Sequence, residues 1–392
     1  MPELSRRVSS ISPSGKDGWE VHFAAATRRQ AGEPIIMLSV GDHDCHTPQE
    51  TVEACVREVR AGHHHYTMLA GIPRLRQALA DASTACTGVP TLASETLSTP
   101  GGQPALFASA LATIDPGDHV IIIAPYYATY PPTFRAAGAE ISVVDALAEN
   151  GFQPDATAIR KAIRPNTRAI LINTPNNPTG AVYTRKTLEG IAAVCREHDL
   201  WLISDEVYWT ITGGREHQSP RSLDGMAERT LVVNSMSKSH GMTGWRVGWI
   251  TAPTAVINKL ISLNLVSTFG LADFTSRAAI EALENHHGVD EIAARYAARR
   301  TLFLDELRGL KEVTVRGSEG GMYVMLDISA VDADCEPFAW GLLEQEQVSV
   351  MPGISFGEAA KGHVRISLCQ PEDVLRDAAQ RIANYVRSKG VS

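Results

Sequence analysis

Short apolar segments alternate with amphipathic ones through the middle of the chain. Residues 119–127, 168–174, 200–207 and 230–235 are almost continuously apolar and rich in β-branched side chains, which predicts strands that are covered on both faces. Between them, residues 184–198 place apolar side chains at helical spacing. Strands that alternate with helices are typical of a mostly parallel sheet with right-handed crossovers. We therefore expect an α/β fold.

The predicted helix at residues 184–198 shows the helical pattern most clearly. Leu188, Ile191, Ala192 and Cys195 follow the i, i+3, i+4, i+7 pattern, and Thr184 precedes them as an expected N-cap. The four side chains should therefore share one buried face.

The pattern changes toward the C-terminus. Residues 287–311 read as one long, charged amphipathic helix, and short strands with turn signals follow it. We expect a large domain at residues 46–285. A smaller α+β domain should combine residues 1–45 with residues 286–392.

Composition removes several classes of function. The chain has 392 residues, of which 44% are hydrophobic, and its net charge is −8, so a nucleic-acid surface or a polybasic membrane patch is not expected. The six cysteines are scattered without a CxxC pair, and no apolar run is long enough to span a membrane. No secretory signal is visible, so we expect a cytoplasmic protein with free thiols and no metal.

Polar residues follow the predicted strands, at the edge where open α/β sheets bind ligands. Lys238 lies after the strand at 230–235, and Asp205 ends the strand before it. A buried lysine beside a cation such as Arg246 has a lowered pKa and suits a Schiff base with a phosphate-bearing aldehyde. Ser235 and Ser237 offer hydroxyls to the same phosphate. A lone lysine, however, is more often an ordinary surface residue.

Other residues at this edge fit the same cofactor. A carboxylate at Asp205 suits a pyridine nitrogen, although an N-cap would explain it equally. Tyr208 and Asn177 are placed to donate to a ring oxygen, and Tyr127 to stack on the ring or simply to pack in the core. The glycine pair that ends at Gly102 opens a predicted helix whose free N–H groups attract anions, or it is plain turn chemistry.

The motifs NNPTG, SDEVY, SMSKSHGMTGWRVGW, MPGISFG and VRIS, in this order, resemble those of the class I and II aminotransferases, which are fold-type-I pyridoxal-phosphate (PLP) enzymes. The resemblance runs from about residue 39 to the C-terminus. Within this family, the sequence resembles more specifically the bacterial subgroup of aspartate- and aromatic-type transaminases, and some segments are similar to arginine–pyruvate transaminases. It implies a large domain with a seven-stranded sheet, a smaller α+β domain, and transfer of an amino group from an L-amino acid to a 2-oxo acid such as pyruvate or 2-oxoglutarate by a ping-pong mechanism.

The resemblance also implies roles for single residues. Lys238 would hold PLP covalently and shuttle the proton, Asp205 would pair with the pyridine nitrogen, and Tyr208 and Asn177 would contact the ring oxygen. The phosphate would be held by Gly102, Gln103, Ser235, Ser237 and Arg246, with Tyr127 stacked on the ring. Tyr66 would reach the phosphate of a neighbouring subunit, which implies a homodimer. The amino-acid carboxylate would be bound by Arg365, with Gly41 and Asn177 also at the substrate.

Three departures from the family pattern concern specificity. Asp42, His43 and Cys45 replace the usual residues of a loop that borders the substrate, Tyr127 stands where Trp or Phe is common, and His240 and Gly241 replace a bulkier aromatic residue and alanine. None removes a chemical requirement. The histidine run at 63–65 is expected to be a solvated or interface turn, because adjacent histidines cannot easily face one ion.

Two alternatives to a transaminase are considered. A PLP-dependent C–S β-lyase shares the fold and much of the chemistry, and the sequence separates it poorly from a transaminase. A non-catalytic PLP-binding regulator would usually carry an added DNA-binding segment, and no basic arm precedes the family pattern here. A basic or broad range of amino-acid donors with pyruvate is the expectation for the substrates.

Overall fold

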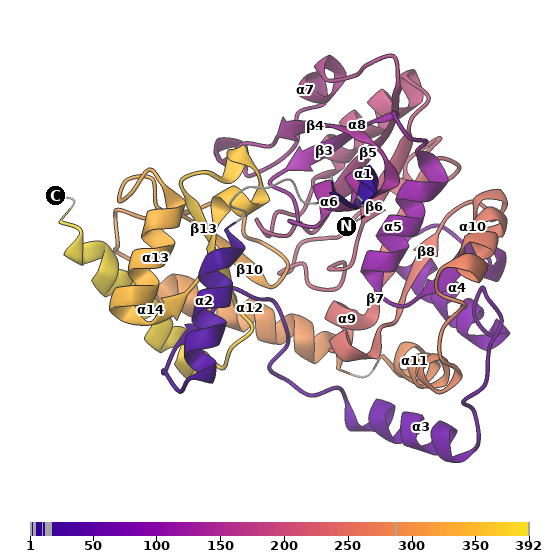
Figure 1. Cartoon of the computed structure of the whole chain (residues 1–392), viewed down its shortest axis with the longest axis horizontal. Coiled ribbons are helices and arrows are strands. Elements are labelled where there is room, and N and C mark those ends of the chain that lie inside the picture. The colour runs from indigo at the N-terminus through magenta and orange to yellow at the C-terminus, as the bar shows by residue number, and fades with distance from the viewer. Residues whose placement is uncertain (1, 3–4, 10, 12–17, 287, 391–392) are drawn as a thin grey trace.

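The computed structural model describes residues 2, 5–9, 11, 18–286 and 288–390. Figure 1 shows a larger part built around one twisted sheet and a smaller part that contains the C-terminal helices and the early helix α2 (Trp19–Gln30). A further short helix, α1 (Arg6–Ser9), precedes them. The predicted combination of a large α/β part with a smaller α+β domain is confirmed.

The large sheet has seven strands in the order β2-β8-β7-β6-β5-β3-β4. They are β2 (Thr96–Thr99), β3 (His119–Ala124), β4 (Glu140–Asp145), β5 (Thr167–Asn173), β6 (Trp201–Asp205), β7 (Thr230–Ser235) and β8 (Gly248–Thr251). Only β8 runs antiparallel to its neighbours, β2 and β7, and the other pairs are parallel. The expectation of a mostly parallel, seven-stranded sheet is therefore correct.

Helices cover both faces of this sheet. They are α3 (Gln49–Arg60), α4 (Pro73–Thr87), α5 (Gly102–Thr113), α6 (Tyr130–Ala137), α7 (Ala156–Lys161), α8 (Arg185–Glu197), α9 (Met236–Ser239), α10 (Thr254–Val266) and α11 (Asp273–Asn285). Alternate residues of β3 face opposite sides: Val120 and Ile122 belong to the core with α5, α6 and α10, and Ile121 and Ile123 to the core with α7 and α8. This double burial explains why the strands are apolar throughout.

The sequence pattern places most element ends within a few residues. The amide of Thr187 donates to Thr184 Oγ1 at 3.2 Å, so Thr184 caps α8 as predicted, and the four apolar positions of that helix are buried. The predicted strand at 119–127 stops earlier, at Ala124, since Pro125 has no N–H to donate to a strand ladder. The helix predicted at 287–311 is α12 (Val289–Glu306); residue 287 lies outside the described residues.

The smaller part holds a four-stranded antiparallel sheet in the order β12-β13-β10-β9. Its strands and helices are β9 (Thr314–Val315), β10 (Tyr323–Asp327), α13 (Cys335–Glu346), β11 (Val348–Ser349), β12 (Met351–Pro352), β13 (His363–Ser367) and α14 (Glu372–Ser388), together with α12. The early strand β1 (Ile36–Met37) pairs in parallel with β11. The N-terminal segment therefore packs on the C-terminal elements.

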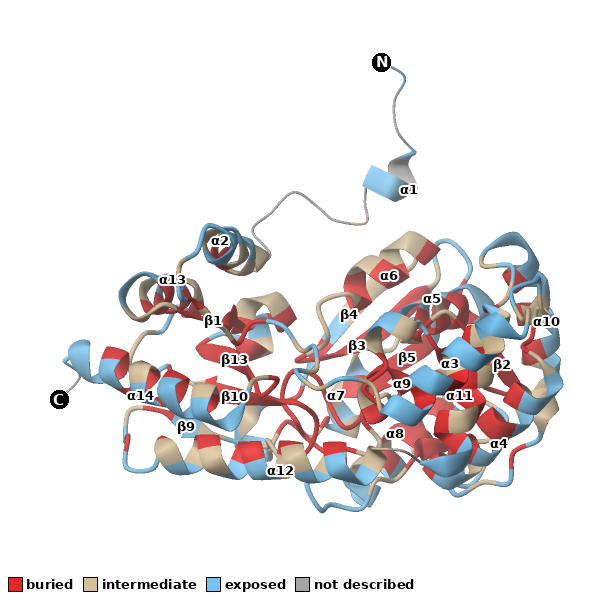
Figure 2. Ribbon diagram, turned by 90° about the horizontal axis from the view of Figure 1, so that it is seen from below, coloured by how far each residue is buried: buried red, intermediate tan, exposed pale blue. Residues whose placement is uncertain are grey.

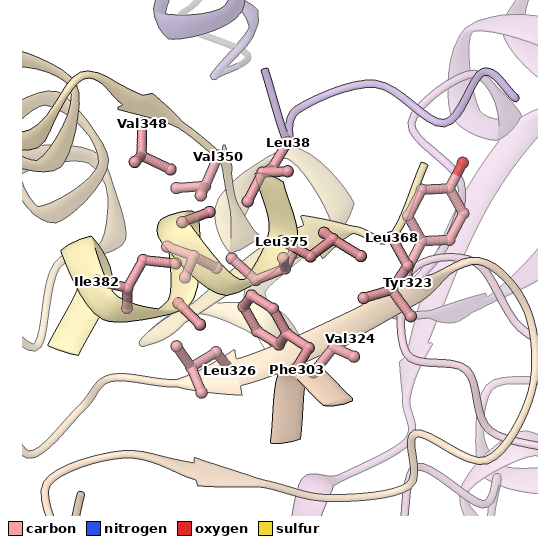
Figure 3. Close-up of a cluster of buried hydrophobic side chains, with 14 of the residues drawn as sticks. Leu38, Phe303, Tyr323, Val324, Leu326, Val348, Val350, Leu368, Leu375 and Ile382 are labelled. Carbon is pink, nitrogen blue, oxygen red and sulfur yellow. The ribbon is translucent and has the colours of Figure 1, made fainter. Parts of the chain in front are cut away.

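An apolar cluster holds the smaller part together (Figure 3). Leu38 from the N-terminal segment belongs to the same cluster as Phe303 of α12, Leu326 of β10 and Leu375 of α14. Tyr323 lies at one end of this cluster, with its hydroxyl directed away from the aliphatic side chains. One end of this core thus reaches the region between the two parts.

Short 3-10 helices occur in the connections. They are η1 (Ala93–Glu95), η2 (Ala148–Asn150), η3 (Pro220–Ser222), η4 (Thr243–Trp245), η5 (Gly353–Phe356) and η6 (Glu358–Ala360). Figure 2 shows buried strands between helices whose outer faces are exposed. Among the described residues, no helix combines the length and the apolar character that crossing a bilayer requires.

Candidate active site

A cavity of about 250 Å³ lies at the edge of the large sheet where the parallel strands end. The segments after β2, β3, β5, β6 and β7 reach it, and the smaller part contributes β10 and β13. This is the edge at which open α/β sheets bind ligands. The cavity is therefore the candidate active site.

The structure brings twelve of the predicted site residues to this one cavity. They are Gly41, Gly102, Gln103, Tyr127, Asn177, Asp205, Tyr208, Ser235, Ser237, Lys238, Arg246 and Arg365. Tyr66 does not line it: its side chain is 87% exposed, and its ring meets the edge of Phe269 at a centroid distance of 4.9 Å.

Lys238 occupies the short helix α9, whose N-cap is Ser235. Its Nζ donates a hydrogen bond of 2.7 Å to the carbonyl oxygen of Gly41. Burial lowers the pKa of Lys238, and the charges of Arg365 and Arg246 lower it further. The predicted direction is correct, but burial is a larger cause than Arg246, the cation that the sequence suggested.

The backbone of Gly41 lies in close contact with the side chain of Tyr323. A Cβ atom at position 41 would lie 1.8 Å from the Tyr323 hydroxyl oxygen, so a side chain at that position would displace the tyrosine. The ring of Tyr323 also meets the edge of the Tyr208 ring, with 6.2 Å between centroids. Glycine at position 41 thus lets the carbonyl that accepts from Lys238 approach the site.

Asp205 is a buried carboxyl group at the end of β6. The Tyr130 hydroxyl donates to its Oδ2 at 2.6 Å, and the amide of Val207 donates to its Oδ1 at 3.2 Å. Burial raises the pKa of Asp205 to about 6, although both hydrogen bonds act in the opposite direction. A cationic group beside this carboxyl would favour its ionised form.

Tyr208 and Asn177 lie together beside Asp205. Asn177 Nδ2 donates to the Tyr208 hydroxyl at 3.4 Å, and the amide of Asn177 donates to Asn173 Oδ1 at 2.6 Å. Asn173 Nδ2 in turn donates to the carbonyl oxygen of Asp205 at 2.9 Å. Burial raises the pKa of Tyr208 well above its usual value, so its hydroxyl stays protonated and can donate.

Arg365 comes from β13 and is 3% exposed. Its two terminal nitrogens donate to Asn177 Oδ1 at 3.1 Å and to the carbonyl oxygen of Ser39 at 2.6 Å, and its Nε has no hydrogen-bond partner within the described residues. The guanidinium lies 4.3 Å from the ring centroid of Tyr323 and 4.7 Å from that of Phe356. The two rings fix its plane, and the donor set suits a carboxylate.

The opposite end of the cavity holds small residues and Arg246. Ser235 Oγ donates to Ser237 Oγ at 2.8 Å, and the amide of Ser237 donates back to Ser235 Oγ at 3.0 Å. Arg246 donates to backbone carbonyls and has a φ of 57°, in the left-handed region. A Cβ at Gly101 would lie 2.1 Å from an Arg246 nitrogen, so the glycine turn and the arginine are in direct contact.

Gln103 and Tyr127 border the cavity, and their side chains already interact with neighbouring protein residues. The Gln103 amide donates to Thr133 Oγ1 at 2.7 Å and accepts from Thr129 Oγ1 at 2.9 Å, which leaves its backbone at the first turn of α5 for a ligand. The Tyr127 ring stands nearly perpendicular to that of Tyr130, with 5.8 Å between centroids.

Tyr130, Asn173 and Tyr323 line the cavity but were not predicted from the sequence. Tyr130 stands three residues after Tyr127, one turn further on, and Asn173 ends a predicted strand. Position in the sequence could therefore have indicated these two residues. Tyr323 gives no such signal, because it comes from the other part of the molecule.

The sequence profile of the aminotransferases of class I and II matches residues 33–382. The chain belongs to this family. The aminotransferase is 40% identical to an arginine–pyruvate transaminase of Pseudomonas aeruginosa over 374 residues, which cover 95% of each chain. It is also 40% identical to an aspartate/prephenate aminotransferase of Thermus thermophilus, over 98% of this chain and 99% of the relative.

Solved structures agree with this assignment. Aspartate aminotransferase from Thermus thermophilus with maleate has a TM-score of 0.92 and 38% identity, and the match covers 98% of this aminotransferase and all of that chain. A Pyrococcus protein has a TM-score of 0.94 and 31% identity over the full length of both. The chain is thus a transaminase of PLP fold type I, and its cofactor is pyridoxal phosphate.

The cavity of the aminotransferase fits this cofactor. The buried amine of Lys238 and the buried carboxyl of Asp205, whose pKa is raised in the absence of a cation, match an aldehyde and a protonated ring nitrogen. The cradle of Gly101 and Gly102, which Arg246 closes, leaves room for a phosphate where a side chain would intrude.

Proposed function

We propose that this aminotransferase moves the amino group of an L-amino acid to pyruvate or 2-oxoglutarate by a ping-pong mechanism. The observation that carries the proposal is the position of the Lys238 amine in one cavity with two arginines, Arg246 and Arg365. One arginine serves the cofactor phosphate and the other the carboxylate that amino acids and 2-oxo acids share. One site can then accept both substrates in turn.

Bound PLP supplies a carbonyl that condenses with amines and a protonated ring that accepts electrons from the substrate Cα. We assign Ser235, Ser237, Arg246 and the amides that begin at Gly102 to the phosphate.

Asp205 pairs with the ring nitrogen, and protonated Tyr208, with Asn177, donates to the ring oxygen. Tyr127 stacks on the ring, and Gln103 contributes from the start of α5. These contacts orient the ring and select which substrate bond reacts.

Lys238 is the proton carrier in this scheme. Burial lowers its pKa, which favours the uncharged amine that can take the proton from the substrate Cα. The same amine returns a proton to Cα when a 2-oxo acid is converted to an amino acid. Arg365 fixes the carboxylate meanwhile, with Gly41 and Asn177 beside it.

The donor we propose is a basic amino acid or a broad set of amino acids, with pyruvate as the preferred acceptor. The name of the Pseudomonas relative supports this choice, and the departures at Asp42, His43 and Cys45 support a side-chain preference unlike that of the aspartate enzymes. His43 is partly buried, and its pKa is lowered to about 4 by desolvation and then by the charge of Lys238, so it is neutral at the substrate loop.

We propose a cytoplasmic homodimer in which Tyr66 reaches the phosphate of the neighbouring site. The exposed ring of Tyr66 and the exposed Val266 and Phe269 nearby support a partner at this surface. We further propose that the large domain spans residues 46–285 and that residues 1–45 and 286–392 form the smaller domain. Arg365 then comes from one domain and Lys238 from the other.

A half-reaction assay tests the proposal. Each common L-amino acid is added to the holoenzyme without an acceptor, and the conversion of the aldehyde form of the cofactor to its amine form is followed by absorbance. Pyruvate or 2-oxoglutarate should then restore the aldehyde form and release the new amino acid. Parallel initial-rate lines at varied donor and acceptor are expected. Ammonia and pyruvate released from a cysteine conjugate without any acceptor would instead identify a β-lyase.

A further inference from the structure

A second cluster of reactive side chains lies behind the active-site cavity. Cys86 of α4, Glu206 and His217 place one ligand atom each within 4.8 Å of one another. Glu206 directly follows Asp205, but it contacts Cys86 and His217, while Asp205 lines the cavity. None of the three side chains has a role in the proposed transamination.

The distances within the cluster are those of one face of a metal tetrahedron. Cys86 Sγ lies 3.3 Å from Glu206 Oε2 and 3.9 Å from His217 Nε2, and Glu206 Oε2 lies 3.0 Å from His217 Nε2. Zinc bound tetrahedrally to sulfur, oxygen and nitrogen would separate these atoms by about 3.4–3.6 Å. Shifts of a few tenths of an ångström would therefore form the site.

The surroundings hold the ligands in place. Ser204 and Ser219 donate to Glu206 Oε1 at 2.7 and 2.8 Å, which leaves Oε2 facing the cluster. Asn234 Nδ2 donates to Cys86 Sγ at 3.5 Å, so the amide of Asn234 borders the cluster. Second-shell hydrogen bonds of this kind orient metal ligands.

Two buried polar atoms at the cluster have no hydrogen-bond partner in the described part of the chain. They are Asn234 Oδ1, in a side chain that is 1% exposed, and His217 Nδ1, in a side chain that is 6% exposed. Turning the Asn234 amide by half a turn would bring its oxygen to the cluster as a fourth ligand. A metal would thus use an oxygen that is otherwise buried at a cost.

We propose that Cys86, Glu206 and His217 form a binding site for a divalent transition metal, with zinc as the best match to the ligands. Zn²⁺ with one thiolate and one carboxylate is electrically neutral, which suits a buried site. Binding replaces the thiol proton by the metal and releases that proton to solvent, with no change in oxidation state. Because binding releases the thiol proton, metal binding should strengthen as pH increases.

The metal would join three segments that are distant in the sequence. Cys86 comes from α4, Glu206 from the end of β6, and His217 from the connection that leads to η3. The metal would therefore stabilise the packing of these segments next to the cofactor pocket.

Cobalt titration of the tag-free holoenzyme tests the proposal. Protein stripped with a chelator is titrated with Co²⁺ under reducing conditions, and the visible bands of tetrahedral cobalt are recorded as difference spectra against metal-free holoenzyme. One Co²⁺ per chain, with a thiolate-to-cobalt charge-transfer band, is expected, and Zn²⁺ should displace it. Failure of the wild-type holoenzyme to bind one equivalent overturns the proposal without any variant.

Substitutions identify the ligands. Cys86→Ser should remove the charge-transfer band, and His217→Gln should weaken binding by at least tenfold, whereas Cys195→Ser, at another buried free thiol in α8, should leave the titration unchanged. Ser219→Ala should weaken binding by about 10-fold or more through the second shell. An unchanged cobalt spectrum in Cys86→Ser would show that the cluster is a hydrogen-bonded polar core only. Zinc should raise the unfolding temperature of the wild type and not of Cys86→Ser, a second measurement that is independent of activity.

Discussion

The hydroxyl of Tyr130 donates a hydrogen bond of 2.6 Å to Oδ2 of Asp205, the carboxyl group that we propose pairs with the cofactor ring. This hydrogen bond favours the ionised carboxylate against the effect of burial. Tyr130 does not need to touch the substrate to influence the reaction. It is a positioning residue that acts through the charge of Asp205.

Tyr130→Phe should therefore lower kcat about 10-fold or more, since a hydrogen bond to a charged group contributes about 1.5–3 kcal/mol. Without this donor the pKa of Asp205 rises, so the acidic limb of the pH–kcat profile should move to higher pH. Tyr183→Phe removes a hydroxyl from a buried tyrosine outside the cavity and is the matched control. A lower kcat with an unshifted acidic limb would contradict a role through Asp205.

Asp205 should destabilise the protein when the cofactor is absent. Its pKa is about 6 in the folded chain against 3.8 for the unconstrained group, so the stability that the protonated form contributes is present below about pH 4 and is lost as pH rises through 6. Asp205→Asn should accordingly increase the unfolding free energy of the cofactor-free protein by roughly 1–3 kcal/mol at pH 7.5.

Urea unfolding of both proteins at pH 4.5 and pH 7.5 measures this difference, which should fall to about a third at the lower pH. With cofactor bound, the order should reverse, because the carboxylate then pairs with the protonated ring. A gain that is equal at both pH values would mean that the substitution acts by packing and not through the charge.

Arg365→Lys should raise KM for both the amino donor and the 2-oxo acid by about 10-fold or more, because lysine cannot present the planar guanidinium fork between the rings of Tyr323 and Phe356. The dissociation constant for PLP should be unchanged. Arg300→Lys is a suitable control, since Arg300 is buried and donates to the carbonyls of Gly320 and Gly321 outside the cavity. Steady-state kinetics and PLP titration separate the two effects.

Gly101→Ala should weaken PLP binding more than its backbone strain explains. Gly101 and Gly117 have φ values of 99° and 92°, so alanine at either position costs about 1 kcal/mol or more of backbone strain. A Cβ at position 117 meets nothing within 4 Å, whereas one at 101 would displace Arg246. PLP affinity should fall only in Gly101→Ala, and equal affinities in the two variants would contradict the phosphate cradle.

A mixed dimer tests the role of Tyr66. Lys238→Ala should be inactive, and Tyr66→Phe should bind PLP less tightly. If Tyr66 serves the neighbouring site, a dimer with one chain of each variant contains one site with both residues intact. Differently tagged chains can be co-expressed and the mixed species purified. Its wild-type PLP affinity at one site per dimer is the expected result, and weakened affinity at every site would contradict the exchange.

The sequence predicted those site residues that follow their own strands. Asp205 ends β6 and Lys238 lies three residues after β7, so a one-dimensional pattern places them at the same edge. Tyr323 could not be found in this way, because its position depends on how β10 packs against the other part of the chain. The fold class followed from strand–helix alternation in the same local manner.

The sequence also could not show which cause of a pKa shift is the larger one, because that depends on how deeply the group is buried. The pattern suggested that Arg246 lowers the pKa of Lys238, but the depth of the amine in the folded chain has the larger effect. Likewise, Cys86 and His217 are 131 residues apart, and only the packing of α4 against elements such as β8 and η3 brings their side chains together. Spacing motifs detect metal ligands that are close in sequence, and the residues of this cluster do not follow such a motif.

The reversed direction of β8 has a consequence for how the active site forms. Because β8 starts at the edge where β7 ends, the chain from Ser235 to Gly248 leaves the rim and returns to it within a single excursion, and Ser235 pairs with Gly248 in the ladder. Lys238 and Arg246 both lie in this excursion, so one antiparallel pair limits how far apart the two residues can be, without any contact from the smaller part.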